Sequence, residues 1–333
     1  MLDVLTYAGN PANLQGLQTN KGFHFVQGDI CDRALVGELF REFAFDTVIH
    51  FAAETHVDRS IHSAEAFLRT NVMGTHVLLE AALTAWKPEF SSRRFHHIST
   101  DEVYGSLGPE DGPFIETSPY NPTSPYAASK AASDFLVRAY ANTHGLSITI
   151  TNCSNNYGPY QFPEKLIPLV IVNALTGRPL PIYGDGMQVR DWLYVEDHCR
   201  GISKVLECGL AGETYNVGSG HEITNLDLIT LICDQLDRRF IKEPELKERF
   251  SDCAAVGGKC RDLIRFVKDR PGHDRRYAIC ADRLRRELGF CSHTTLASGI
   301  SHTIEWYLEN DSWWRAIRSG AYEDWIELQY GNR

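Results

Sequence analysis

The chain has 333 residues, of which 43% are hydrophobic, and its formal net charge is −10 with a pI near 5.7. This length exceeds that of one typical domain, so we expect either one large α/β domain or two lobes. Nucleic acids and membrane surfaces are bound by basic faces, so the acidic balance argues against both as partners.

Apolar strands and amphipathic helices alternate through the first half of the chain. Strands are predicted at residues 23–29, 46–53, 94–100 and 147–154, and helices at about 33–43, 64–86 and 126–144. Strands separated by helices of this length form βαβ units, whose strands run parallel. The sequence therefore predicts an α/β fold with a doubly wound parallel sheet of the Rossmann type.

The beginning of the chain lacks elements that a dinucleotide-binding sheet requires. Such a sheet opens with a strand, a glycine-rich turn and a helix whose N-terminus binds the pyrophosphate. The chain begins instead with Met1, Leu2 and Asp3, which resemble the end of a second strand. We expect one βα unit of about thirty residues to be missing, either because the start is set too late or because the chain is truncated.

The pattern loosens after Asn156 and predicts a second, smaller domain. A helix is predicted at 164–176, a short strand at 180–183 and a helix at 195–207, and helices dominate from about residue 225 onward. We expect residues 1–160 to form a dinucleotide-binding domain. Residues 161–333 are expected to form a mostly helical domain that binds the substrate, with some segments (about 190–225) returning to the first lobe.

The nine cysteines are odd in number, widely spread and without a Cys-x-x-Cys pair. Metal sites favour closely spaced pairs and disulfide frameworks favour short secreted chains, so we expect thiols and no metal site. No apolar stretch predicts a membrane span, and the N-terminal residues lack the zones of a signal peptide. The sequence therefore predicts a cytoplasmic protein without a membrane anchor.

Tyr126 and Lys130 form a Tyr-x-x-x-Lys pair within the helix predicted at 126–144. This spacing places a phenol and an ammonium one turn apart on the same face, where the cation can lower the pKa of the phenol. A phenol tuned in this way can act as a general base near neutral pH. Such pairs also occur by chance on many helices, so the spacing is only a moderate indication of hydroxyl oxidation.

Asp101 and Glu102 follow the strand predicted at 94–100, and a loop of about two dozen residues separates them from Tyr126. In open α/β sheets ligands lie outside the carboxyl ends of the strands, which is where this order places these side chains. One carboxyl can protonate a leaving hydroxyl while the other removes an acidic C–H proton. The combination predicts oxidation coupled to elimination of water.

With these residues placed, the chain resembles the dTDP-glucose 4,6-dehydratases of the extended short-chain dehydrogenase/reductase superfamily, from Asp3 to about Trp314. The Tyr-x-x-x-Lys pair is common to the superfamily, whereas several other segments are more specific. These segments are residues 5–10 (LTYAGN), 54–60 (ETHVDRS), 100–105 (TDEVYG), 151–160 (TNCSNNYGPY), 190–197 (RDWLYVED) and 269–273 (DRPGH).

The resemblance implies a reaction in three stages. Tyr126, tuned by Lys130, would take the proton of the sugar 4-hydroxyl while hydride passes from C4 to NAD⁺, and Thr100 would hydrogen-bond that oxygen. Glu102 would then remove the C5 proton of the 4-keto sugar while Asp101 protonates the departing C6 hydroxyl. Return of hydride to C6 would regenerate NAD⁺, so tight retention of the cofactor is expected.

The resemblance also implies the binding residues. Residues implied to bind NAD are Asp3, Asp29, Ile30, Phe51, Ala52, Ala53, Thr70, Tyr126, Lys130 and Asn156. Residues implied to bind the nucleotide sugar, dTDP-glucose, are Thr55, Asn155, Lys165, Leu166, Pro181, Ile182, Tyr183, Arg190, Asn225, Asp269, Arg270 and His273. Two of them, Arg190 and Arg270, are suited to a diphosphate, because a planar guanidinium binds phosphate oxygens bidentately. The helices at 64–86 and 126–144 are those that this superfamily pairs into a homodimer.

Two alternatives remain open from the sequence. The first is a dehydratase or epimerase acting on another nucleotide sugar, although a 4-epimerase would need the Tyr-x-x-x-Lys pair and have no use for Asp101 and Glu102. The second is a non-catalytic remnant, because loss of a central strand would expose apolar surface and unpaired backbone groups. The choice of nucleobase rests on the resemblance alone.

Overall fold

The computed structural model describes residues 1–318 and 321–330, and the chain divides into two compact units. The first unit contains residues 1–154, 198–220 and 277–292, and the second contains 155–197, 221–276 and the described part of 293–333. Residues 198–220, within the predicted range of about 190–225, and residues 277–292 thus belong to the first unit. Each unit is described by itself.

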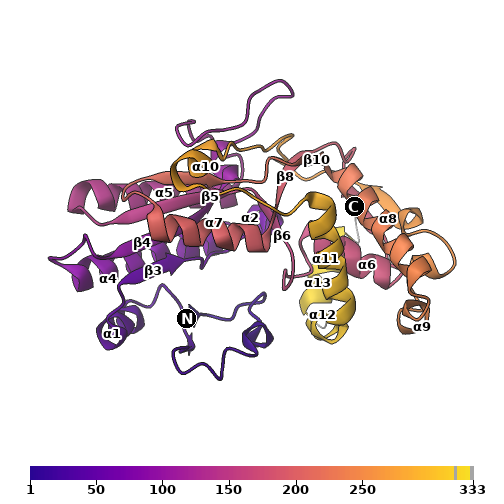
Figure 1. Ribbon diagram of the computed structural model, residues 1–333, viewed down its shortest axis with the longest axis horizontal. Helices are drawn as coiled ribbons and strands as arrows, with labels where there is room; N and C mark the ends of the chain where they lie inside the picture. Colours follow the sequence, from indigo (N-terminus) through magenta and orange to yellow (C-terminus); the bar gives the residue numbers. More distant parts are fainter. Residues whose placement is uncertain (319–320, 331–333) are drawn as a thin grey trace. The chain divides into compact units, whose positions relative to one another are not determined.

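The first unit contains a four-stranded parallel sheet in the order β3-β4-β5-β9 and a two-stranded parallel sheet of β1 and β2. Figure 1 shows β3, β4 and β5 side by side. This arrangement confirms the predicted fold class. The elements are β1 (Leu2–Asp3), η1 (Pro11–Leu14), β2 (Val26–Gln27), α1 (Arg33–Phe43), β3 (Thr47–His50), α2 (Val57–His62), α3 (Glu65–Phe67), η2 (Leu68–Gly74), α4 (Thr75–Trp86), β4 (Arg94–Thr100), η3 (Asp101–Tyr104), α5 (Pro125–His144), β5 (Ile148–Cys153), most of α7 (Val195–Cys208), β9 (Thr214–Val217) and α10 (Asp282–Leu288).

Strand β3 forms one edge of the four-stranded sheet. Among the described residues no strand pairs with its other side, and β1 and β2 form their own sheet. Ile49 on β3 is 42% exposed, and Phe51, just after it, is 56% exposed. Among the described residues, no neighbouring strand therefore covers the exposed apolar side chains at this edge.

Helix α5 has a well-defined beginning and end. The Ser124 hydroxyl accepts a hydrogen bond from the Ala127 amide at 3.1 Å, and Pro125 occupies the first turn, where its missing amide costs nothing. The helix ends at Gly145, whose left-handed φ of 74° suits a residue without a Cβ atom. These two signals fix the helical register, and therefore decide which side chains of α5 face the sheet.

The core of the first unit contains an unusual number of buried histidines. His96 and His97 are fully buried on β4, His50 is buried on β3, and His198 is buried on α7. His96 Nδ1 lies 2.8 Å from Thr149 Oγ1, and His50 Nε2 lies 2.8 Å from Thr75 Oγ1. The rings of His96 and His50 are thus held inside an otherwise apolar core by hydroxyl partners.

The second unit contains the sheet β10-β8-β6 and the parallel pair β11-β7, with α6, α8 and α11 packed around one apolar core (Figure 1). The short strands β10 and β11 were not predicted, because three or four residues carry too little periodicity. No helix in residues 1–318 and 321–330 has the length and apolar character needed to cross a membrane. The elements are β6 (Asn155–Tyr157), α6 (Leu166–Leu175), β7 (Leu180–Tyr183), β8 (Val189–Tyr194), β10 (Glu222–Thr224), α8 (Asn225–Lys242), α9 (Leu246–Arg249), η4 (Ala254–Val256), η5 (Cys260–Leu263), β11 (Ile264–Val267), α11 (Leu296–Glu309), α12 (Asp311–Ile317) and α13 (Ala321–Tyr330).

The buried histidines predict that the protein loses stability in mild acid. Burial, followed by nearby positive groups, lowers the pKa of His96 to about 3 and of His97 to about 4, and burial lowers that of His198 to about 4. Below the ordinary histidine pKa of 6.5 the unfolded chain binds protons that the folded chain does not, so the free energy of unfolding falls as the pH drops toward 4. Each such group contributes about 1.4 kcal/mol per pH unit over this range.

Denaturant unfolding at pH 7, 6 and 5 measures this slope. His96→Gln should make the slope shallower, whereas His62→Gln, at an exposed position of α2, should leave it unchanged. Equal slopes in the wild-type protein and the His96→Gln variant would contradict this account of acid sensitivity.

Candidate active site

Tyr126 and Lys130 lie on the face of α5 that packs against the sheet. Both side chains are buried, with 7% and 4% exposure. Lys130 Nζ donates a hydrogen bond of 2.7 Å to the carbonyl oxygen of Ile98 on β4, and the Tyr126 amide donates to Ser60 Oγ at 3.2 Å. The structure therefore places Lys130 at the carboxyl half of β4 and Tyr126 one turn earlier on the same face of α5.

The predicted acidic pair lies directly after β4, in the short helix η3. Thr100 caps this helix: its hydroxyl accepts a hydrogen bond of 3.3 Å from the Glu102 amide and lies 3.4 Å from Asp101 Oδ1. The helix ends at Gly105, whose φ is 92° and whose Cα faces the Asn121 carbonyl so closely that an added Cβ would lie 2.4 Å from its oxygen. Only glycine fits there, so the turn that presents the two carboxyls is fixed by the sequence.

The same neighbourhood contains Tyr126, whose pKa responds to the residues of η3. Burial raises the pKa of Tyr126 well above its ordinary value, and the charges of Glu102 and Asp101 raise it further, while a hydrogen bond with Thr100 lowers it. Tyr126, Thr100 and both carboxyls therefore share one environment. The pKa nevertheless moves in the direction opposite to the one that the Tyr-x-x-x-Lys spacing predicts, because burial outweighs the effects that favour the phenolate.

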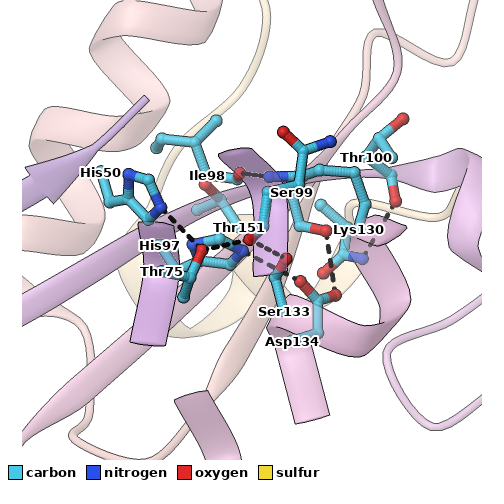
Figure 2. Close-up of polar contacts among 12 residues, drawn as sticks. His50, Thr75, His97, Ile98, Ser99, Thr100, Lys130, Ser133, Asp134 and Thr151 are labelled. Atoms are coloured by element: carbon cyan, nitrogen blue, oxygen red, sulfur yellow. Dashed lines mark hydrogen bonds and ion pairs between the residues drawn. The ribbon is translucent and has the colours of Figure 1, made fainter. Parts of the chain in front are cut away.

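One group at this site was not predicted from the sequence. Asp134 is fully buried one turn beyond Lys130, and Figure 2 shows its carboxylate close to Ser99 and His97 of β4. Asp134 Oδ2 accepts hydrogen bonds from Ser99 Oγ at 2.9 Å and Tyr120 Oη at 2.8 Å. The available signal was the spacing of four residues from Lys130, which continues the same helical face.

Asn71 is a second residue that the sequence analysis missed. Its side-chain oxygen accepts a hydrogen bond of 2.8 Å from the Glu54 amide, and its nitrogen donates to the Glu54 carbonyl at 3.0 Å and to Ser129 Oγ at 2.8 Å. It therefore ties the segment that follows β3 to η2 and to α5. The predicted cofactor residues Phe51 to Ala53, Thr70 and Lys130 each lie within three positions along the chain of one of these hydrogen-bonded residues.

The residues predicted for the adenosine half of the cofactor lie after the parallel strands β1 and β2. Asp3 Oδ1 accepts a hydrogen bond of 2.7 Å from the Leu5 amide. Asp29 Oδ1 accepts one of 2.8 Å from the Cys31 amide, while Asp29 Oδ2 lies 3.0 Å from the Arg69 guanidinium, beside Thr70 on η2. Ile30 is buried next to Asp29.

These residues fit a dinucleotide. Carboxylates at the ends of two adjacent parallel strands suit the hydroxyls of a ribose, and the exposed Phe51 ring offers an apolar contact. Asn156, the remaining predicted cofactor residue, lies on β6 in the second unit.

The second unit brings several predicted substrate residues together. Asp269 Oδ2 accepts a hydrogen bond of 2.9 Å from Gln188 Nε2, and Asp269 Oδ1 lies 2.6 Å from His273 Nδ1. The ring centroids of His273 and Tyr183 are 5.9 Å apart, and the Asn225 amide donates to the Gln188 carbonyl at 2.9 Å. Gln188 thus links two predicted residues and was itself not predicted.

Two guanidinium groups give this cluster a positive potential. Arg190 is 5% exposed and donates to the Val189 and Asp274 carbonyls at 2.7 and 2.9 Å. Burial, together with the charges of Arg270 and Arg190, lowers the pKa of His273 to about 4. A locally positive site on an acidic protein suits an anionic ligand.

The other predicted substrate residues lie on separate elements. Pro181 and Ile182 precede Tyr183 on β7, Asn155 pairs with Trp192 between β6 and β8, and Lys165 and Leu166 begin α6. Thr55 follows β3 and belongs to the first unit.

The parallel sheet, the Tyr-x-x-x-Lys face on the helix after β4, and the additional second unit define an extended short-chain dehydrogenase/reductase. A family model described as GDP-mannose 4,6 dehydratase matches residues 2–303. A dTDP-glucose 4,6-dehydratase of Neisseria meningitidis serogroup B is 52% identical over 96% of this chain and 89% of its own length.

The solved structures agree with these matches. The structure of dTDP-glucose 4,6-dehydratase from Streptomyces venezuelae with NAD and TYD bound has a TM-score of 0.84 and 46% identity, covering 95% of this chain and 89% of that chain. A UDP-glucose 4-epimerase from Thermotoga maritima has a TM-score of 0.77 but only 26% identity, covering 92% of this chain and 90% of that chain. The chain belongs to the dTDP-glucose 4,6-dehydratase family.

The positive electrostatic potential around His273 can be tested in the absence of substrate. Replacing Arg270 with Gln removes one of the two positive charges that lower the pKa of His273, so this pKa should rise. An NMR titration of the His273 ring measures it. Arg265→Gln, an exposed change on β11, is the control. An unchanged pKa in Arg270→Gln would contradict the positive potential described above.

Proposed function

We propose that this chain catalyses the NAD-dependent dehydration of dTDP-glucose to dTDP-4-keto-6-deoxyglucose. The observation that carries the proposal is the shared environment of a phenol, Tyr126, and two carboxyls, Asp101 and Glu102. Oxidation of a hydroxyl needs only the phenol, whereas loss of water also needs an acid and a base. The relatives named above support this function over that of an epimerase.

NAD⁺, when bound, would supply a reversible hydride carrier, which holds the hydride removed from C4 until C6 is reduced. We propose that Asp3, Asp29 and Ile30 hold its adenosine half. Phe51 to Ala53 and Thr70 would line the dinucleotide, and Tyr126, Lys130 and Asn156 would lie near the nicotinamide.

In the oxidation step Tyr126 accepts the proton of the 4-hydroxyl, and Thr100 hydrogen-bonds the same oxygen. Because burial and two carboxylates oppose the phenolate, this role requires positive charge beside the phenol. Lys130, on the same face of α5, supplies this charge when its ammonium is protonated.

In the elimination step the 4-keto group makes the C5 proton acidic. Glu102 removes this proton, and Asp101 donates a proton to the C6 hydroxyl, which leaves as water. The two carboxyls are adjacent in η3, so a single turn presents the acid and the base together.

We propose that the second unit binds the nucleotide diphosphate. Arg190 and Arg270 would bind the phosphate oxygens, and the rings of Tyr183 and His273 would contact the remaining nucleotide. Asp269, Asn225, Asn155, Lys165, Leu166, Pro181, Ile182 and Thr55 complete the proposed substrate set.

Replacing both carboxyls separates oxidation from elimination. In Asp101→Asn/Glu102→Gln, the NADH formed by C4 oxidation should accumulate and absorb near 340 nm, while formation of the 4-keto-6-deoxy product falls by about two to four orders of magnitude. Glu110→Gln, an exposed change in the following loop, is the matched control. Equal loss of NADH formation and product formation in the double variant would exclude the assigned roles.

We also propose that two copies of the chain associate through α4 and α5. Three exposed residues, Ala128, Phe135 and Ala139, lie along one side of α5, and the Phe135 ring is 58% exposed. Small residues around an exposed aromatic ring suit close packing of a second copy of the same helix. This proposal agrees with the interface that the superfamily resemblance implies.

Light scattering combined with size exclusion tests the dimer. Phe135→Lys should shift the measured mass from twice the chain mass of 37.6 kDa toward that mass itself. Ile241→Lys, at a 75% exposed position on α8, should leave the dimer intact. A wild-type protein of single chain mass at micromolar concentration would exclude the proposal.

The cytoplasm is the compartment we propose for this reaction. Each of the nine cysteines, all within residues 1–318, is a thiol in the structure. Thiols persist in reducing compartments. The net charge of −10 adds to this expectation, since it favours a dissolved enzyme over one attached to an anionic surface.

A further inference from the structure

We infer that Asp134 is a positioning residue for the oxidation step, acting as the buried counterion that keeps Lys130 protonated beside Tyr126. This inference rests on the proposed function, in which a charged Lys130 favours the phenolate of Tyr126. It assigns a role to a carboxylate that makes no proposed contact with the sugar or with NAD.

The first observation is geometric. Tyr126, Lys130 and Asp134 occupy successive turns of α5 at a spacing of four residues, and all three are buried, with exposures of 7%, 4% and 0%. Residues at this spacing lie on one face of a helix. The phenol, the ammonium and the carboxylate therefore follow one another along a single buried face.

The second observation concerns Lys130, whose charge is costly at this depth. Its Nζ donates a 2.7 Å hydrogen bond to the Ile98 carbonyl, which is a neutral acceptor. Burial lowers the pKa of Lys130, and the negative charge of Asp134 acts in the opposite direction. A buried ammonium without a counterion tends to lose its proton, so the negative charge of Asp134 favours the protonated form of Lys130.

The third observation concerns the surroundings of Asp134, which favour its ionised form. Burial by itself raises the pKa of Asp134, but contact with His97, the charge of Lys130 and the hydrogen bond from Ser99 together leave this pKa below its ordinary value. Asp134 Oδ2 accepts hydrogen bonds from the hydroxyls of Ser99 and Tyr120 (Figure 2 shows the first of these). Two hydroxyl donors stabilise a carboxylate and leave its charge available to a cation.

The other carboxylate oxygen, Asp134 Oδ1, is buried and accepts no hydrogen bond from the described residues. His97 Nε2 lies 3.2 Å from Asp134 Oδ1, yet among the described residues no donor makes a hydrogen bond of good geometry to this oxygen. Because burial and the charge of Lys130 lower the pKa of His97 to about 4, the ring is neutral at pH 7. Lys130, whose positive charge lowers the pKa of Asp134, is therefore the cation that we assign to this carboxylate.

The remaining titratable groups around Lys130 and Asp134 do not supply an alternative counterion. His50 on β3 is neutral, because burial lowers its pKa well below the ordinary value. Cys153 on β5 contributes a thiol that acts on Lys130 less than Asp134 does. Arg138 on α5 donates to Tyr120 Oη at 3.0 Å. The carboxyls of η3 act on Tyr126, at the other end of the same face.

Removing the charge of Asp134 tests the inference. In Asp134→Asn the protonated form of Lys130 loses its counterion, so the pKa of Lys130 should fall by about one unit or more. NMR titration of side-chain ¹⁵N-labelled lysine measures this directly, because the chain has only nine lysines and Lys130→Met identifies the signal. This readout requires neither substrate nor NAD.

The same variant should change the pH profile of the reaction. When Lys130 is neutral, Tyr126 ionises only at higher pH, so the rising limb of kcat/KM for C4 oxidation should move to higher pH. Asp134→Glu, which keeps the charge, should restore the limb in part. Ser133→Ala is the matched control, because it removes a buried hydroxyl that bonds the Asn71 and Ser129 carbonyls without changing any charge.

A purely structural Asp134 would give a different result. Asp134→Asn would then lower stability but change neither the pKa of Lys130 nor the pH at which kcat/KM rises. That result would overturn the inference. If Asp134→Asn does not fold, Lys130→Met offers the reciprocal test: the pKa of Asp134 should rise once its cation is gone, and an unchanged value would count against the pair. A wild-type protein that forms no product would instead refute the proposed function, whatever the titration of Lys130.

Discussion

The packing of one face of α5 against β4 is the constraint on which the site depends. Lys130 Nζ binds the Ile98 carbonyl, and Asp134 binds Ser99, so two charged side chains of the helix are fixed to consecutive residues of the strand. A buried charge is tolerated only when it is paired and hydrogen-bonded, which leaves this helix few alternative positions. Tyr126 is consequently fixed beside Thr100 and the two carboxyls that follow it.

The two units differ in the sign of the charge at their candidate sites. In the first, burial and carboxylates oppose ionisation of Tyr126, so the chemistry depends on local positive charge. In the second, Arg190 and Arg270 make a positive cluster on a chain whose net charge is −10. The proposed binding of an anionic nucleotide sugar by an acidic protein rests on this cluster, because nearby buried or half-buried guanidinium groups act more strongly than distant, screened surface charge.

The sequence predicted the helices and strands whose hydrophobic pattern extends over many consecutive residues. The helix predicted at 126–144 and the apolar strand at 94–100 were sufficient to place Tyr126 and Lys130 on one helical face after that strand. The resemblance supplied the roles of Asp101 and Glu102. The partners of Asp134 could not be predicted, because Ser99 and Tyr120 are distant from it along the chain and meet it only after folding. The upward pKa shift of Tyr126 was missed for a related reason, since it arises from burial, which spacing does not report.

Transfer of an isotopic label tests the central claim most directly, namely that one site oxidises C4, removes water and reduces C6 of the same sugar. The substrate is dTDP-glucose with deuterium at C4, incubated with the protein and NAD⁺ in ordinary water. The account predicts that the product carries the deuterium at C6 and a solvent proton at C5. Deuterium retained at C4, or released to the solvent without reaching C6, would contradict it.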